Sequence, residues 1–244
     1  MKILLIGDSC EDVYVYGDVN RLNPEAPVPI LEPKREERTN GMAYNVYNNL
    51  NSFGAEVHML TNDEIIVKTR FIDQRSNQQI LRYDEGSEVE EFTGELDIDG
   101  EFDALIISDY DKGFITQEKL FGLVDWFDGP VFVDTKKITI PGDAFIKINE
   151  LEFKKVTHYD PDNLIITRGG QGAEYQGKLY PAEKVNVYDV VGAGDTFLAA
   201  LVVGYLTTRS IETAIPFANK AAAIAVSHTG TYVLTQEDVD EILY

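Results

Sequence analysis

Short apolar runs alternate with longer, more mixed stretches along much of the chain. The short runs end at polar or glycine residues and predict buried strands at 2–7, 56–61, 103–108, 131–134, 145–148 and 163–167. The longer stretches predict helices at 41–53, 117–126, 150–156, 194–206, 211–228 and 236–243. Strands that alternate with helices form mainly parallel sheets covered on both faces, so the predicted fold class is α/β.

Two segments depart from this alternation. Residues 13–39 and 64–83 are β-rich, and prolines interrupt the first segment. Proline suits edge strands because it has no N–H to donate to a central sheet. We therefore predict a small β-sheet that stands off the main body as a lid, within a single domain spanning 1–244. The acidic stretch 84–101 is predicted to be a solvated loop.

The chain carries 42 Asp and Glu against 21 Lys and Arg, a formal net charge of −21. Nucleic acids and anionic membranes are bound mainly through surplus basic residues, so neither is an expected partner. A small anionic ligand remains compatible with this charge if basic groups gather locally. The candidates are Arg70, Arg82, Lys112, Lys136 and Arg168.

A single cysteine, Cys10, excludes an internal disulfide and fits a reducing compartment. Residues 1–7 hold too few apolar positions for a signal peptide, and the longest apolar run, 197–206, is about half of what crosses a bilayer. We therefore expect a cytoplasmic location.

Polar side chains follow the predicted strands at their carboxyl ends, where ligands bind on open parallel sheets. They are Asp8, Asp12, 108–110, Asp134, Asn149, Glu152, 167–172 and Asp195. Asp8 or Asp109 could instead cap a neighbouring loop, and Asn149 could cap the helix that follows it. Their recurrence after one strand after another favours a ligand site over unrelated caps.

The segment 189–195, with sequence DVVGAGD, precedes the most apolar predicted helix. Its two glycines permit a tight turn and a close approach to a ligand. A helix start presents unpaired N–H groups and a partial positive charge, which suit a phosphate or a developing anion. Asp195 could accept a proton from an attacking hydroxyl within hydrogen-bond reach. The structural alternative is a glycine turn with Asp195 as the N-cap.

These residues resemble the ribokinase-like (PfkB) carbohydrate kinases, from the first strand to the last helix. Within that family the chain is similar to the kinase domain of the bacterial heptose-phosphate kinases that feed ADP-heptose synthesis. The resemblance implies a three-layer sandwich with a mainly parallel central sheet and a small β-sheet lid. DVVGAGD matches the D-x-x-G-A-G-D signature, which implies that Asp195 is the catalytic base. The amides of Gly192, Ala193 and Gly194 would form the anion hole.

Further matches imply a site for ATP. The segment 167–172, with sequence TRGGQG, matches the family's T-x-G-x-x-G nucleotide motif and nominates Thr167, Gly169 and Gly172. The helix around 217–223 resembles the one whose asparagine lies beside the adenine, which is Asn219 here.

The resemblance also implies ions as cofactors. The segment 149–152, with sequence NELE, matches N-x-x-E, so Asn149 would help place the nucleotide phosphates and Glu152 would act on Mg²⁺ indirectly. Asp189 and the backbone near Gly230 would border a monovalent cation such as K⁺.

The acceptor site is nominated by stretches 21–29, 76–82 and 108–113, which are similar to heptose-phosphate kinases rather than to ribokinase or adenosine kinase. The implied sugar-binding residues are Asp8, Asp12, Asn23, Gly41, Asn45 and Asp109. Arg82 and Lys112 are implied as contacts to the phosphate of the sugar. A salt bridge within the lid for Arg82 and a solvated Lys112 are the alternatives.

The chain departs from the family's G-G-x-x-x-N substrate motif. Residues 40–45 read NGMAYN, so the first glycine is lost, and Met42 and Tyr44 crowd the start of the helix. The connections 62–64 and 156–163 also look shortened, each lacking a helix. These departures bear on the identity of the sugar more than on the chemistry.

The expected activity is transfer of the γ-phosphoryl group of ATP to a hydroxyl of a sugar or sugar phosphate, with heptose 7-phosphate as the first candidate. The alternatives are a kinase for a hexose, a ketose phosphate or a nucleoside, and a sugar- or nucleotide-binding protein of the same fold without catalysis. The lid is expected to close over the sugar and exclude water. Its exposed strand edges favour a homodimer formed through the lid.

Overall fold

A computed structural model describes residues 1–94 and 101–243 and places eight strands in one central sheet, in the order β12-β11-β10-β9-β8-β7-β1-β4. The strands are β1 (Lys2–Gly7), β4 (Glu56–Leu60), β7 (Ala104–Asp109), β8 (Val131–Thr135), β9 (Phe145–Asn149), β10 (Leu164–Thr167), β11 (Ala173–Tyr175) and β12 (Lys178–Tyr180). From β4 to β10 the neighbours pair in parallel, whereas β10, β11 and β12 pair antiparallel. The mainly parallel sheet is confirmed.

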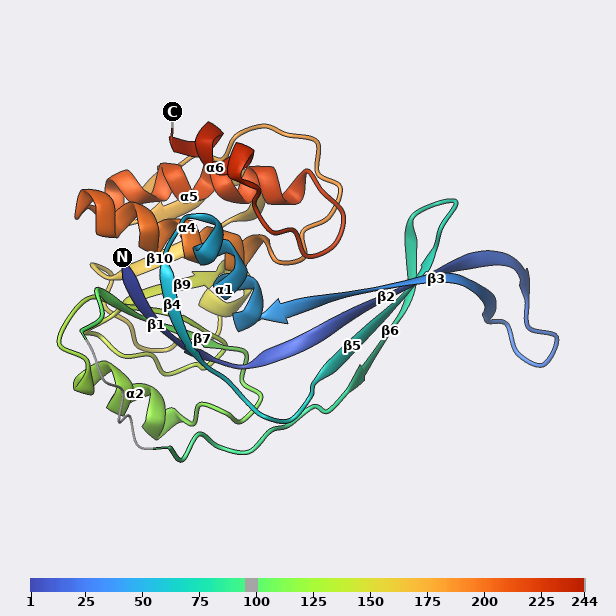
Figure 1. Cartoon of the computed structure of the whole chain (residues 1–244), viewed down its shortest axis with the longest axis horizontal. Coiled ribbons are helices and arrows are strands. Elements are labelled where there is room, and N and C mark those ends of the chain that lie inside the picture. The colour runs from blue at the N-terminus through green and yellow to red at the C-terminus, as the bar shows by residue number, and fades with distance from the viewer. Residues whose placement is uncertain (95–100, 244) are drawn as a thin grey trace.

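Helices cover both faces of this sheet. They are α1 (Ala43–Ser52), α2 (Gln117–Trp126), α3 (Glu150–Phe153), α4 (Ala193–Thr208), α5 (Ile211–Val226) and α6 (Gln236–Leu243). Alternate residues of a strand point to opposite faces, so Ile3 and Leu5 pack in the core beneath α4 and α5, whereas Leu4 and Ile6 pack in the core beneath α2. Figure 1 shows these helix layers on the two sides of the sheet. The three-layer architecture is confirmed.

A second, smaller sheet forms the lid. Its order is β3-β2-β5-β6, with β2 (Ser9–Leu22), β3 (Pro29–Met42), β5 (Val67–Asp73) and β6 (Gln78–Glu85). The sheet leaves the body as an arm (Figure 1). A strand of 14 residues such as β2 spans about 45 Å, and its exposure rises toward its far end. The near end of the lid lies beside the body, and Asn77 and Gln79 at the β5–β6 turn line a cavity together with Tyr188 of a body loop.

Several predicted bounds differ from the structure. Strands β2 and β3 continue to the body and take in Ser9 and Met42, beyond the predicted 13–39. Helix α3 ends at Phe153 instead of 156, and 154–163 contains no helix. The hairpin of β11 and β12 was not foreseen, because three-residue strands are too short for a visible alternation. Part of the predicted acidic loop 84–101 lies outside the described residues.

No helix in the described part of the chain is both long and apolar enough to span a membrane.

Candidate active site

The start of α4 is built from glycine. Gly192 is the N-cap in a left-handed conformation, with φ of 78°, and no side chain caps the helix. A Cβ on Gly192 would lie 2.6 Å from Asn45 Nδ2, and one on Gly194 would lie 3.0 Å from Lys147 Nζ. Both glycines are therefore needed for the close approach of neighbouring side chains. The Ala193 N–H, nominated for the anion hole, donates to the Val190 carbonyl at 3.4 Å, and the Asp195 N–H donates to the Gly192 carbonyl at 3.1 Å. The N–H groups of Gly192 and Gly194 have no such partner within the described residues and are left for an anion or water.

Asp195 sits in the first turn of α4 and is only 3% exposed. It is not the N-cap, so that structural alternative is wrong. Its Oδ1 accepts a hydrogen bond from the Tyr110 hydroxyl at 2.6 Å, and its Oδ2 accepts one from Asn45 Nδ2 at 3.2 Å. Burial raises the pKa of Asp195 to about 6, against the lowering effects of the Tyr110 hydrogen bond and of Lys147. A carboxyl with such a pKa is suited to accept a proton near neutral pH.

Lys147, on β9, is a buried ammonium beside the start of α4. Its Nζ donates to Asp134 Oδ2 at 2.5 Å. Burial alone would lower the pKa of Lys147, but Asp134 and then Asp195 raise it above its ordinary value, so the side chain stays charged. Sequence analysis missed Lys147. The available signal was a lysine in the middle of an otherwise apolar strand.

The near end of the lid meets the body at Asp12. Arg70 Nη1 donates to Asp12 Oδ1 at 2.5 Å, and Thr231 Oγ1 donates to Oδ2 at 3.4 Å. A Cβ on Gly41 would lie only 2.1 Å from Asp12 Oδ2, so glycine is required at residue 41. The structure thus brings Asp12, Gly41 and Asn45 together with Asp195, as the resemblance implies for an acceptor site.

Met42 does not crowd this site. It is buried with Cys10 and Ile66 in a small core at the base of the lid. Its φ of 58° is unusual for a residue with a side chain and turns the chain from β3 into α1.

Asp8 and Asp109 follow β1 and end β7, and both are buried. Asp8 Oδ2 accepts from the Tyr110 N–H at 2.6 Å, and its Oδ1 has no hydrogen-bond partner within the described residues. Asp109 instead accepts from Thr135 Oγ1 at 2.5 Å and pairs with Lys137 at 3.2 Å. Asp8 therefore holds the backbone of Tyr110 in place, and Asp109 is engaged in a structural network.

The nominated nucleotide residues lie along the loops beyond β9 and β10. Asn149 and Glu152 form a capping box at α3, because Asn149 Oδ1 accepts from two backbone N–H groups and Glu152 Oε2 accepts from the Asn149 N–H at 2.8 Å. Asn149 therefore caps the helix that follows it, which was the structural alternative. The NH2 group of its side chain and Glu152 Oε1 take no part in the capping box and could contact a ligand. Thr167 ends β10, one residue before the turn that contains Gly169.

Gly172 and Asn219 border the same hairpin. Gly172 has φ of 102°, and a Cβ there would lie 2.0 Å from the Tyr180 carbonyl oxygen. Asn219 Nδ2 donates to that carbonyl at 2.9 Å. Asn219 therefore fixes the end of β12 against α5.

Asp189 ties two loops together at the proposed cation position. Its Oδ1 accepts from the Val191 N–H and its Oδ2 from the Gly230 N–H, each at 3.0 Å. Asp189 and Gly230 also line a cavity of about 170 Å³ between the body loops and the lid, together with Tyr14 and Arg70.

Two nominated residues are not brought to this cluster. Asn23 lies just past the far end of β2, where its Oδ1 accepts from the Glu25 N–H at 2.9 Å. Arg82 is half-exposed and binds Asp84 through two hydrogen bonds, of 2.8 and 2.9 Å. The salt bridge that was the alternative for Arg82 is therefore present.

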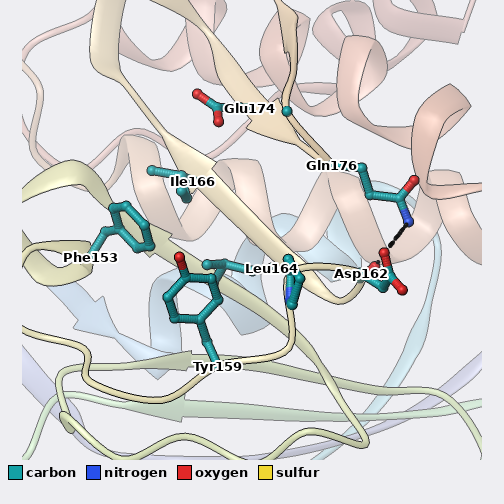
Figure 2. A pocket seen from close by; sticks show the side chains of 9 residues that line it. Phe153, Tyr159, Asp162, Leu164, Ile166, Glu174 and Gln176 are labelled. Atoms are coloured by element: carbon teal, nitrogen blue, oxygen red, sulfur yellow. Dashed lines mark hydrogen bonds between the residues drawn. The ribbon is translucent and has the colours of Figure 1, made fainter.

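A second cavity, of about 290 Å³, lies elsewhere (Figure 2). Leu164 and Ile166 line it from the face of β10 that packs toward α2, and Gln176 at its rim donates to Asp162 at 3.5 Å. Tyr159, Pro161 and Asp162 of the helix-free connection 154–163 also line it. None of the nominated residues lines it.

The residues present fit a nucleotide phosphate. Gly194 lies in the first turn of α4, and the Lys147 ammonium lies close beside it. An anion at this place would meet positive potential both from the helix start and from Lys147. No group of three His, Cys, Asp or Glu side chains within the described residues could hold a metal ion alone. Mg²⁺ keeps several waters and binds through phosphates and one or two carboxylates, so Glu152 fits an indirect role.

The fold is similar to that of a ribokinase from Thermotoga maritima, with a TM-score of 0.72 and 18% identity, covering 99% of this chain and 98% of that one. It is also similar to the phosphofructokinase-2 of Escherichia coli in complex with potassium, with a TM-score of 0.69 and 16% identity, covering 98% and 97% of the two chains. The family model described as pfkB family carbohydrate kinase matches residues 147–238. The fold and the family model together indicate a ribokinase-like carbohydrate kinase.

The chain belongs to the pfkB family of carbohydrate kinases. It is 32% identical over 299 aligned positions to the bifunctional protein HldE of Nitratiruptor sp., which covers 98% of this chain. The chain spans 64% of the length of that protein. Because 299 positions exceed the 244 residues of this chain, the relative carries segments that are absent here, in keeping with the short connection 154–163.

Proposed function

We propose that this protein is an ATP-dependent kinase that phosphorylates a hydroxyl group of a sugar phosphate. The observation that carries the proposal is a buried carboxylate, Asp195, in the uncapped first turn of α4, with the charged Lys147 beside Gly194. A binding protein without catalysis has no need of a buried base with a raised pKa next to an anion site.

In the proposed reaction the acceptor hydroxyl donates its proton to Asp195 while its oxygen forms a bond to the γ-phosphorus. The bond from that phosphorus to the bridging oxygen of ADP breaks. Lys147 and the N–H groups of Gly192 and Gly194 stabilise the negative charge on the transferring group. Bound ATP with Mg²⁺ supplies the phosphoryl group and neutralises part of its charge.

Around the acceptor, Asn45 orients Asp195 through its 3.2 Å hydrogen bond, and Asp12 is held in place by Arg70. We propose that Asp12, Gly41 and Asn45 line the side of the site where the sugar hydroxyls bind. Heptose 7-phosphate is the first acceptor we propose, on the resemblance to heptose-phosphate kinases. A hexose, a ketose phosphate and a nucleoside are the acceptors to compare.

The test is a panel of these acceptors with ATP and Mg²⁺, read by release of ADP and by mass of the product. We expect heptose 7-phosphate to give the highest kcat/KM. Preference for another acceptor would correct the substrate and keep the chemistry. Binding of sugar and nucleotide with no turnover of any acceptor would instead support a non-catalytic role.

We expect Tyr110→Phe to shift the pH dependence of the reaction. The Tyr110 hydroxyl lowers the pKa of Asp195 by donating to its Oδ1. Without that bond the pKa of Asp195 rises further above about 6, so the base becomes ionised only at higher pH. The acid limb of kcat/KM against pH should therefore move to higher pH, with activity recovered in alkaline buffer. An unchanged acid limb would remove Tyr110 from this role.

We also propose that two copies associate through the lid. The strand order leaves β3 and β6 at the edges of the small sheet, and unpaired edges favour pairing. Light scattering at micromolar concentration should give twice the chain mass of 27.4 kDa. Proline substitutions at exposed positions of β6 should lower that mass to one chain, and a monomeric wild-type protein would contradict the proposal.

A further inference from the structure

Two lysines, Lys68 and Lys136, lie over the ring of Tyr110, and a third, Lys112, follows Tyr110 by two residues. Lys68 comes from β5 of the lid, Lys112 from the loop after β7, and Lys136 from the loop after β8. Lys136 Nζ lies 4.3 Å from the centre of the Tyr110 ring, and Lys68 Nζ lies 5.4 Å from it. Sequence analysis nominated Lys112 and Lys136 separately and did not find Lys68.

The other two lysines near the site are neutralised by carboxylates. Lys137 pairs with Asp109 and Asp111, and Lys147 pairs with Asp134. In contrast, no Asp or Glu of the described residues forms a salt bridge with Lys68, Lys112 or Lys136. In a chain with a net charge of −21, three ammonium groups gathered without carboxylate partners indicate a place for an anion that is not part of the chain.

The electrostatics of Lys68 point the same way. Burial lowers the pKa of Lys68, and the charges of Lys136 and Lys112 lower it further. Asp12 offsets part of this effect, but its Oδ1 is bound by Arg70. Such mutual repulsion is unfavourable in the free protein and is relieved when an anion binds between the ammonium groups.

We propose that Lys68, Lys112 and Lys136 bind the phosphate that the acceptor sugar already carries. This inference rests on the proposed kinase function and names the residues that select a phosphorylated acceptor. The Tyr110 hydroxyl touches Asp195 at 2.6 Å, while the ring of the same tyrosine carries the ammonium groups. The reacting hydroxyl and the phosphate would therefore be separated by about the length of one tyrosine side chain, a span that a sugar bridges.

The proposal replaces Arg82 as the contact to this phosphate. The Arg82 guanidinium donates from Nε and Nη2 to the two carboxylate oxygens of Asp84, and the side chain is half-exposed. Lys112 keeps the role that the sequence indicates for it.

The test compares Lys68→Met, Lys112→Gln and Lys136→Gln, each in the full chain, with two controls. Lys119→Gln removes a lysine that also lies over an aromatic ring, 5.2 Å from the centre of Phe92 on the α2 side. Arg82→Gln removes the alternative contact. Acceptors are heptose 7-phosphate and the same heptose without its phosphate, and each variant is first checked for a wild-type melting curve.

We expect each of the three lysine variants to lower kcat/KM for heptose 7-phosphate by about 10- to 100-fold, the effect of losing one hydrogen bond to a charged group. The activity with unphosphorylated heptose and the KM for ATP should not change, and both controls should behave like wild type. Equal losses with both acceptors, or a raised KM for ATP in place of acceptor discrimination, would overturn the inference. The second outcome would place the lysines on the nucleotide phosphates.

Calorimetric binding of the two sugars without ATP separates this inference from the proposed function. If wild type binds heptose 7-phosphate in a lysine-dependent way but never forms ADP, the kinase proposal fails and the phosphate site stands. If wild type forms ADP and the lysine variants keep full preference for the phosphorylated sugar, only the phosphate site fails. Fructose 6-phosphate and fructose serve as a second pair of sugars. The phosphate-site inference is also overturned if wild-type protein binds neither sugar phosphate more tightly than the corresponding sugar without phosphate.

Discussion

Asp195→Asn is expected to lower kcat by about 10²- to 10⁴-fold while sugar and nucleotide still bind, because an amide keeps the shape of the carboxyl group but cannot accept the proton. The Tyr110 hydroxyl can still donate to the side-chain oxygen of residue 195, whereas the new amide nitrogen replaces the oxygen that accepts from Asn45 Nδ2. The measurement is single-turnover phosphoryl transfer together with calorimetric affinity for each ligand. A variant that turns over at nearly the wild-type rate would show that Asp195 is not the base.

The same substitution has a second expected effect, on stability. Burial raises the pKa of Asp195 from 3.8 to about 6, so the folded state disfavours the ionised form. The resulting loss of stability develops as pH rises from the unfolded-state pKa through about 6, and it is complete above that pH. From pH 4 to pH 8 the free energy of unfolding of Asp195→Asn relative to wild type should therefore rise by on the order of 3 kcal/mol, measured by denaturant titration at both pH values.

Lys147→Gln is expected to lower kcat by about 10²- to 10³-fold with a smaller effect on acceptor KM, because one charged donor beside the anion site is lost. The single variant also leaves Asp134 without its partner, and breaking a buried ion pair costs about 3–5 kcal/mol. Loss of activity alone would therefore not separate catalysis from folding.

The matched control is the double variant Lys147→Gln with Asp134→Asn, which removes both charges of the pair. It should recover much of the melting temperature lost in the single variant and should still be slow. Lys147→Arg keeps the positive charge and should be faster than Lys147→Gln. If the double variant recovers the rate along with the stability, the role of Lys147 is structural.

A few contacts join the lid and the body at the proposed acceptor site. Asp12 on β2 reaches Arg70 on β5, and Thr231 after α5 reaches Asp12. Lys68 of β5 reaches over Tyr110 of the body. Any movement of the lid would therefore change the surroundings of both Asp12 and Tyr110 in the proposed acceptor site.

Two parts of the candidate site could be predicted because the geometry of each depends on one short, continuous segment of the chain. DVVGAGD fixes both the left-handed Gly192 and the position of Asp195 two residues into α4. Asn149 and Glu152 are three residues apart, and that spacing alone permits the capping box. Neither feature depends on a distant part of the chain.

The partners of these residues could not be predicted in the same way. Tyr110 and Asp195 are 85 positions apart, and their contact depends on how the loop after β7 leaves the sheet. Arg82 was nominated over Lys68, although both lie on lid strands. The charge of each residue is visible in the sequence, but the salt bridge of Arg82 with Asp84 and the position of Lys68 over Tyr110 are not.

The sequence by itself determined the α/β class, the parallel sheet, the existence of a second small sheet and the glycine turn before α4. These features follow from local periodicity and backbone preference, which act over a few residues. Only the tertiary structure decided that Lys147 lies beside Gly194, that Asp109 is engaged by Lys137 and that Lys68 and Lys136 lie over Tyr110. Those contacts join strands and loops far apart in the chain, and their geometry is fixed by how the core packs.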